Sequence, residues 1–221
     1  MTAHRESFRQ PLTPRRDFLK ASALGIGTAA GLSLARSAHA GGSDTIKIGM
    51  VGCGGRCSGA ALDAMTADPG TRLVAMADLF ADRVHSKRQL LAASKPQQVA
   101  VDDEHCFVGL DGYQKVIDSV DVVLIACAAK FHPLYLRAAI EAGKHVFVEK
   151  PHAIDPAGIK VVAEACQLAH AKNLGVMSGL HSRYDSRIRE TIERVLDGQI
   201  GEIVSIEENF VRGPYGDTKR P

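Results

Sequence analysis

The sequence predicts an α/β protein built around a parallel sheet, and three observations support this. Short apolar runs rich in β-branched residues alternate with longer helical stretches, which is typical of repeated β–α–β units. The first run, residues 46–51, leads directly into a glycine-rich turn. The second run, residues 72–77, ends at Asp78. Apolar runs without polar alternation indicate strands whose sheet is covered on both faces.

The composition is that of an ordinary globular protein, because 45% of the 221 residues are hydrophobic and 24% are charged, with a net charge of +2. The positive charge comes from residues 1–40, which hold six Arg or Lys and two acidic residues, so residues 41–221 are slightly acidic. We therefore do not expect a nucleic-acid partner, since binding phosphates requires a basic face.

Residues 1–40 have the organisation of an export signal. Arg15 and Arg16 precede an apolar stretch over residues 21–35, and an Ala-x-Ala cleavage pattern closes the segment. The segment resembles a twin-arginine signal, which the export machinery reads on folded proteins. We expect a periplasmic protein starting near Gly41, or a membrane-anchored one if the signal is not cleaved. A basic arm before a buried helix is the less favoured alternative, because Gly and Ala dominate the apolar stretch.

The elements around the glycine turn match the requirements of dinucleotide binding. A helix is expected over residues 60–67, between the two strands. Gly52 permits the tight turn after the first strand, and Gly54 lets main-chain amides approach a pyrophosphate at the positive end of the helix. Cys57 departs from the usual Gly or Ala at its position, although its side chain is still small. A β–α–β unit without a ligand is the alternative.

Asp78 lies 26 residues after Gly52, where a carboxylate can accept hydrogen bonds from ribose hydroxyls. Its negative charge would repel a 2′-phosphate, so NAD is favoured over NADP as the cofactor. Arg83 lies nearby and can reverse this preference, and NADP therefore remains possible.

The alternation continues along the chain. Up to residue 149 we expect a helix over 82–93, a loop with a short helix over 107–118, a strand over 121–127, a helix over 134–142 and a strand over 145–149. After that we expect a helix capped by Asp155, a strand over 175–180, a helix over 186–196 and a strand over 202–211. The helix after Asp155 should pack through a stripe formed by Ile159, Val162, Cys166 and Ala169. Small residues at the end of strand 121–127 leave room for a ligand. Pro151 forces Lys150 into an extended conformation at the same edge of the sheet.

Three segments together resemble the glucose–fructose oxidoreductase/inositol dehydrogenase (Gfo/Idh/MocA) family: residues 49–56, residues 142–151 with their Glu-Lys-Pro, and the leader. The resemblance runs from about Thr45 to Tyr215. It implies a Rossmann dinucleotide-binding domain over residues 44–151, followed by an α/β substrate domain with an open sheet, of which residues 152–221 are the beginning. In this family the second domain often mediates oligomerisation, so a homo-oligomer is expected of a full-length protein.

The resemblance also implies the residues of the site. Lys150 would lie beside the nicotinamide and position, or exchange a proton with, the reacting hydroxyl. His181 is a second catalytic candidate, and Arg183 and Tyr184 are candidate substrate contacts, with a polar loop as the alternative. The expected cofactor contacts are Gly52, Cys53, Gly54, Gly55, Arg56, Asp78, Cys127, Ala128, His132, Glu149 and Lys150. His132 alternatively has a capping or buried role.

These features predict an exported NAD(P)-dependent oxidoreductase that moves hydride between a tightly held nicotinamide cofactor and a sugar or polyol. A redox glycosidase with bound NAD is the nearest alternative. The family's later catalytic histidine and acidic residue have no counterpart before Pro221, so a truncated, non-catalytic nucleotide-binding module is also considered.

The five cysteines, Cys53, Cys57, Cys106, Cys127 and Cys166, lack C-x-x-C spacing, and the nine histidines are scattered. We therefore expect no metal site. An oxidising compartment permits a disulfide, but this pattern does not require one.

Overall fold

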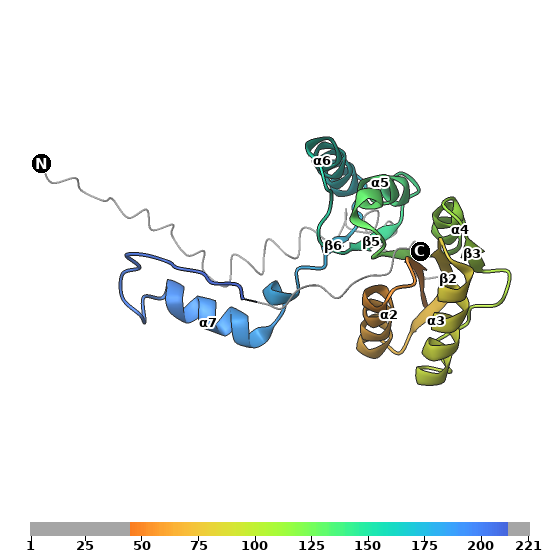
Figure 1. Cartoon of the computed structure of the whole chain (residues 1–221), viewed down its shortest axis with the longest axis horizontal. Coiled ribbons are helices and arrows are strands. Elements are labelled where there is room, and N and C mark those ends of the chain that lie inside the picture. The colour runs from red at the N-terminus through yellow and green to blue at the C-terminus, as the bar shows by residue number, and fades with distance from the viewer. Residues whose placement is uncertain (1–44, 212–221) are drawn as a thin grey trace, which may run out of the picture. The chain divides into compact units, whose positions relative to one another are not determined.

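A computed structural model describes residues 45–211. They form a six-stranded sheet in the order β3-β2-β1-β4-β5-β6 (Figure 1). The strands are β1 (Ile46–Val51), β2 (Thr71–Asp78), β3 (Cys106–Val108), β4 (Val122–Ile125), β5 (His145–Val148) and β6 (Val176–Ser178). The pairs β1–β4, β2–β3, β4–β5 and β5–β6 are all parallel. The predicted α/β fold with a Rossmann-type sheet is confirmed.

The helices divide between the two faces of the sheet. They are α2 (Gly55–Ala67), α3 (Ala81–Ser94), α4 (Gly112–Ser119), α5 (His132–Glu141), α6 (Pro156–Ala171) and α7 (Ser186–Leu196). Helices α2 and α3 pack on one face, whereas α4, α5 and α6 lie on the other (Figure 1). Successive strand residues therefore enter different cores: Met50 belongs to the core that contains Met65 of α2, and Val51 belongs to the core that contains Leu136 of α5.

The strands expected over 121–127 and 175–180 are shorter in the structure, as β4 and β6, and two other expected elements differ more. Helix α2 begins at Gly55 and so starts within the glycine turn, earlier than residue 60. The segment expected to be a loop before the helix of residues 107–118 contains the short strand β3. With only three residues, β3 has too little alternation to be recognised from the sequence.

The cap of α6 is as predicted, and its packing stripe is confirmed in part. The Asp155 carboxylate accepts a hydrogen bond from the Gly158 amide at 2.6 Å, and Pro156 opens the helix. Of the stripe, Ala169 is buried and Val162 packs partly buried against the same core, whereas Ile159 is 55% exposed; Ala165, outside the stripe, is also buried. Cys166, also expected in the stripe, is exposed. The buried face is rotated because α6 packs against α5.

The sheet continues beyond the expected domain boundary at residue 151, because β6 pairs with β5. The division into domains therefore stays a prediction. Helix α7 has no buried residue, and residues 201–211, expected to contain a strand, have no regular secondary structure. An extended segment is a strand only when it pairs with another, and residues 202–211 have no such partner among residues 45–211.

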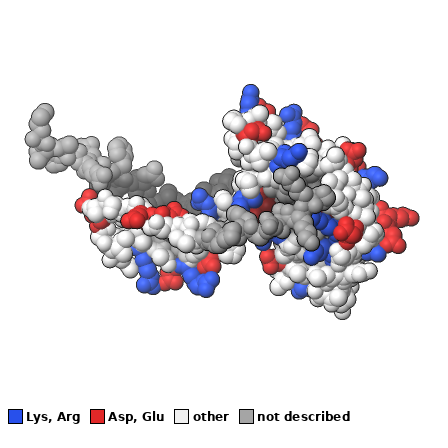
Figure 2. Space-filling view, in the orientation of Figure 1, with Lys and Arg blue, Asp and Glu red and all other residues white. Residues whose placement is uncertain are grey.

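The proposed signal over residues 1–40 lies outside the described residues. Within residues 45–211, no helix has the combined length and apolar character needed to cross a bilayer. On the face visible in Figure 2, acidic and basic residues are interspersed over the described part.

Candidate functional site

The candidate site lies at the carboxyl ends of β1 and β4, where the connections after two neighbouring strands go to opposite faces of the sheet. Strands β1 and β4 are neighbours, yet β1 leads into α2 on one face and β4 leads into α5 on the other. The loops after the two strands consequently diverge and leave a crevice at their carboxyl ends. In parallel α/β sheets, this switch point is where ligands bind.

Gly52 forms the tight turn after β1, on one side of this crevice. Its φ is +97°, and its amide donates to the Ala77 carbonyl at 2.8 Å. A Cβ at this position would lie 2.8 Å from both the amide nitrogen and the Cα of Cys127. The left-handed backbone and the close approach of the loop after β4 both require glycine here.

The first turn of α2 is open to a ligand. Gly54 precedes α2 as its N-cap, and a Cβ built on either Gly54 or Gly55 would meet no atom within 4 Å. The first amides of a helix have no acceptor within the helix and carry partial positive charge. A phosphate can therefore approach the main chain here. Cys57 is fully buried against the Leu124 carbonyl, which explains why its small side chain still allows α2 to pack closely on β4.

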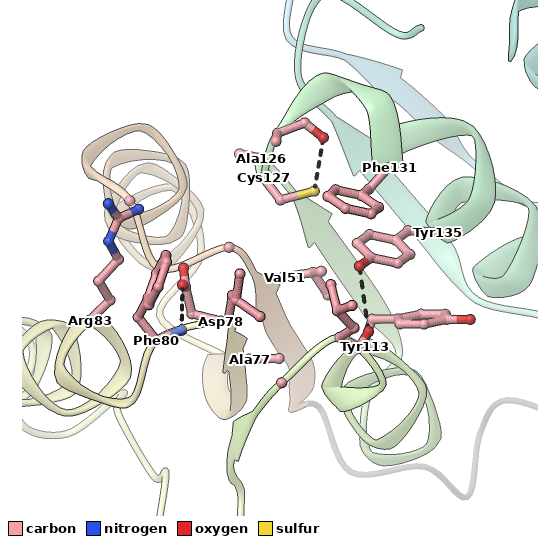
Figure 3. A pocket seen from close by; sticks show the side chains of 16 residues that line it. Val51, Ala77, Asp78, Phe80, Arg83, Tyr113, Ala126, Cys127, Phe131 and Tyr135 are labelled. Carbon is pink, nitrogen blue, oxygen red and sulfur yellow. Dashed lines mark hydrogen bonds between the residues drawn. The ribbon is translucent and has the colours of Figure 1, made fainter. Parts of the chain in front are cut away.

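The Asp78 carboxylate is held at the end of β2 by main-chain donors. The amide of Cys53 donates to Oδ2 at 2.6 Å. The amide of Phe80 donates to Oδ1 at 3.1 Å, as Figure 3 shows. Each carboxylate oxygen retains further acceptor capacity. The fixed carboxylate can thus accept hydrogen bonds from a ribose while its position is set by the two loops.

A cavity of about 230 Å³ lies between Asp78 and the loop after β4. Its walls include Phe80, Tyr113, Phe131 and Tyr135, with Tyr113 and Tyr135 stacked at 4.2 Å between ring centroids (Figure 3). Burial raises the pKa of Tyr135 to about 12, with smaller contributions from nearby acidic groups. Arg83 places its guanidinium 5.2 Å from the Phe80 ring centroid, at the same cavity. An apolar, aromatic wall beside a carboxylate suits an adenosine.

A second cavity, of about 550 Å³, lies on the other side of the same loop. Its lining residues are Arg56, Ala126, Cys127, Glu149, Lys150, Gly179 and His181. Ala126 and Cys127 line both cavities, so the loop after β4 is the point where the two meet. The structure therefore brings together the catalytic candidates Lys150 and His181 beside three further expected cofactor contacts, Arg56, Cys127 and Glu149.

His132, an expected cofactor contact, is buried beneath the loops instead of lining a cavity. It is 1% exposed and lines neither cavity. Its Nδ1 lies 2.8 Å from the Pro151 carbonyl oxygen, and its Nε2 lies 3.1 Å from that of Cys127. This is the buried alternative, in which His132 joins the Lys150–Pro151 segment to the loop after β4.

The remaining candidates are divided among different surfaces. Cys53 is buried, and burial raises the pKa of its thiol to about 12. It lines neither cavity and contributes its amide to Asp78. Ala128 lines the cavity beside Asp78. Arg183 shares a groove of about 670 Å³ with Lys150 and His181. Tyr184 lines a separate groove along β4, β5 and β6, which it shares with Arg56 and His181.

Sequence reasoning missed the aromatic walls and the role of one glycine. Tyr113 and Tyr135 lie on helices, where an aromatic residue is typical of a core position, and only the packing of α4 beside α5 brings the rings together. Gly179 follows β6 and faces the Glu149 carboxylate, a contact that no local signal reveals.

A parallel sheet with a tight glycine turn, an open helix N-terminus and a carboxylate at the end of β2 defines a dinucleotide-binding Rossmann protein. The profile described as "Oxidoreductase family, NAD-binding Rossmann fold" matches residues 46–178. The chain belongs to this family, Gfo/Idh/MocA, and carries its NAD-binding domain.

Individual relatives agree with this assignment. The chain is 32% identical over 165 residues to an inositol 2-dehydrogenase of Serratia proteamaculans, covering 72% of this chain and 43% of that protein. It is 34% identical over 151 residues to a glycosyl hydrolase family 109 protein of Solibacter usitatus, covering 64% and 33%. The chain thus spans between a third and a half of the length of these relatives.

Solved structures show the same fold. The scyllo-inositol dehydrogenase of Lactobacillus casei, solved with bound NAD(H) and scyllo-inositol, matches with a TM-score of 0.56 and 26% identity, over 72% of this chain and 43% of that one. The 3-ketoreductase KijD10 of Actinomadura kijaniata, solved with NADP, matches with a TM-score of 0.53 and 25% identity, over 72% and 46%. Relatives of this chain therefore hold either nicotinamide cofactor.

Proposed function

We propose that the chain is the cofactor-binding part of an NAD-dependent oxidoreductase that transfers hydride between a tightly held nicotinamide and a sugar or polyol. One observation carries this proposal: two cavities meet at Cys127, with Asp78 in one and Lys150 in the other. The open first turn of α2 lies at the end of β1, beside this meeting point. A dinucleotide has the same order of parts, with an adenosine and a nicotinamide nucleoside joined by a pyrophosphate.

In this proposal each end of the site has its own task. Asp78 binds the adenosine ribose, and the amides after Gly54 hold the pyrophosphate. When bound, the nicotinamide supplies the hydride chemistry. The Lys150 ammonium exchanges a proton with the reacting hydroxyl or orients it, and His181 is the second candidate for proton transfer. Arg183 and Tyr184 are the proposed substrate contacts.

NAD is the proposed cofactor because the Asp78 carboxylate cannot turn away from the ribose. Two main-chain amides hold it in place, so a 2′-phosphate at this position would meet a fixed negative charge. Arg83 lines the same cavity and is the residue that would offset this repulsion for NADP.

Calorimetric titration of the 221-residue chain with NAD and with NADP tests the cofactor directly, together with mass spectrometry of natively purified protein. We expect NAD to co-purify and to bind more tightly than NADP. Folded protein that neither contains nor binds a nicotinamide nucleotide would overturn the proposal. For the whole protein, reduction of NAD by inositol and related polyols is the corresponding activity assay, since such a dehydrogenase is among the relatives.

A redox glycosidase is the second candidate, favoured by the 34% identity to a protein named as a glycosyl hydrolase. Such an enzyme oxidises its substrate, eliminates the aglycone and reduces the product again with the same bound cofactor. Release of an aglycone without net formation of NADH would support this candidate, whereas net NADH formation with a polyol would support the dehydrogenase.

We also propose export through the twin-arginine machinery, on the evidence of the leader alone. Replacing both Arg15 and Arg16 by lysine should leave the protein in the cytoplasmic fraction, and unchanged fractionation would contradict export by this route.

A retained cofactor follows from export, because nicotinamide nucleotides are scarce outside the cytoplasm. Ready loss of the nucleotide on dilution would contradict retention. A homo-oligomer is proposed for the whole protein and can be checked by light scattering.

A further inference from the structure

A buried carboxylate lies directly beside Lys150. Glu149 is 4% exposed, and both of its carboxylate oxygens are engaged. Oε1 accepts a hydrogen bond from Nε of Arg56 at 2.5 Å, and Oε2 accepts one from the Lys150 amide at 3.1 Å. Burying a carboxylate is unfavourable unless it is paired, so this arrangement depends on Arg56.

Gly179 provides the space that the Glu149 carboxylate occupies. A Cβ on Gly179 would lie 2.9 Å or less from all three carboxyl atoms of Glu149. The Gly179 amide donates to the Val148 carbonyl at 2.9 Å, so the backbone at this position is held against β5. The clash would fall on the end of a flexible side chain. An alanine at 179 would therefore displace the carboxylate while leaving the backbone in place.

Arg56 is held at one nitrogen and open at the others. It is the second residue of α2, and its side chain is 49% exposed, against 6% for that of Glu149. Only Nε bonds to Glu149, and Arg56 is one of the residues that line the cavity containing Lys150 and His181. A guanidinium fixed in this way presents a directed pair of donors to an anion, next to the free amides of the first turn of α2.

We propose that Glu149 and Gly179 are positioning residues that fix Arg56 for binding the pyrophosphate of the dinucleotide. Gly179 leaves space for Glu149, Glu149 orients the guanidinium, and Arg56 contacts the phosphate. This chain of contacts connects β6, β5 and α2 at the cavity beside Lys150. The inference rests on the proposed function, since it concerns how the same cofactor is held.

Calorimetric titration of the 221-residue chain with NAD, ADP-ribose and adenosine tests this role. Arg56→Ala, Glu149→Ala and Gly179→Ala should each weaken NAD and ADP-ribose roughly tenfold, the effect of losing one charge-assisted hydrogen bond. Adenosine, which has no phosphate, should bind each variant as it binds the unaltered chain. Glu149→Gln should retain part of the affinity, because an amide oxygen still accepts from Nε.

The double variant Arg56→Ala/Gly179→Ala separates an indirect effect from a direct one. If Gly179 acts through Arg56, the double variant should bind NAD no more weakly than Arg56→Ala alone. Losses that multiply would mean that residue 179 affects the nucleotide directly and would overturn its positioning role. Gly59→Ala is the matched control, because a Cβ at Gly59 meets no atom within 4 Å.

The remaining outcomes are also decisive. Equal losses for adenosine and NAD would indicate general damage to the site and overturn the inference, as would variants that bind NAD as tightly as the unaltered chain. If the unaltered chain bound no nucleotide, the proposed function would fail and this inference with it. Nucleotide binding by the unaltered chain therefore distinguishes a failure of the proposed function from a failure of this inference alone.

Discussion

The two ends of the site are constructed in different ways. At the proposed adenosine end, main-chain amides hold Asp78, and the walls include the aromatic side chains of Tyr113 and Tyr135 from the packed helices α4 and α5. At the proposed reaction end, Lys150 follows β5, and His181 and Arg183 belong to a short 3-10 helix, η3 (His181–Arg183), after β6; all three residues are exposed. The first end is thus a product of sheet packing, whereas the second depends on side chains with freedom to move. Substitutions at the first end should therefore change both the stability of the fold and the affinity for NAD. Substitutions at the second end should change one of these without the other.

The largest expected effect is that of Gly52→Ala. A positive φ and a Cβ placed 2.8 Å from the backbone of Cys127 should together reduce the free energy of unfolding by about 3 kcal/mol, which urea denaturation measures. Gly54→Ala is the matched control, since a Cβ there meets no atom within 4 Å. It should spare stability but hinder the pyrophosphate and weaken NAD. Equal stability losses for both variants would contradict the assigned geometry of the turn.

Asp78→Ala should have the next largest effect. Loss of the carboxylate removes the proposed ribose contact and the repulsion of a 2′-phosphate. NAD should bind roughly tenfold more weakly, and the ratio of NADP to NAD dissociation constants should fall toward one. Calorimetry with both nucleotides measures this ratio. Asp82→Ala, at the exposed start of α3, is the control and should leave the ratio unchanged. An unaltered ratio in Asp78→Ala would remove Asp78 from cofactor selection.

Cys127 tests whether the two cavities form one continuous site. Burial raises the pKa of its thiol to about 11, so the reactive thiolate is scarce at neutral pH. Alkylation of Cys127 should be slow at pH 7 and accelerate about tenfold for each pH unit up to its pKa. Bound NAD should protect it, whereas the exposed Cys166 should react regardless of NAD. Peptide mass spectrometry distinguishes the two, and alkylation of Cys127 at the same rate with saturating NAD would contradict a continuous site.

Lys150→Ala should have the smallest effect on binding and stability. The residue is exposed, so the free energy of unfolding should change by no more than about 0.5 kcal/mol. The dissociation constant for NAD should stay within about twofold, below the scale of one lost hydrogen bond. In the whole protein the same substitution should slow turnover. A loss of NAD affinity as large as that of Asp78→Ala would remove the distinction between the two ends, and wild-type turnover would exclude Lys150 from the mechanism.

Local patterns were sufficient to predict most strands, the glycine turn and the cap of α6. They failed where a neighbour decides the outcome. The buried face of α6 depends on its contact with α5, so the apolar spacing placed Val162 and Ala169 correctly but wrongly included Ile159 and Cys166. The expected strand over residues 202–211 could not be predicted reliably, because strand formation requires a partner. His132 carried a family-based expectation of a cofactor contact, but its surroundings come from two separate loops.

The sequence by itself determined that Gly52 and Lys150 follow strands and that Asp78 ends one, and parallel pairing then places all three at one edge of the sheet. Only the tertiary structure decided that β4 lies between β1 and β5, with Cys127 where the two cavities meet. It also decided that Arg56 reaches Glu149 across 93 residues of sequence. Such contacts arise from the packing of α2 and of distant strands around one sheet, and the periodicity of a single segment contains no information about them.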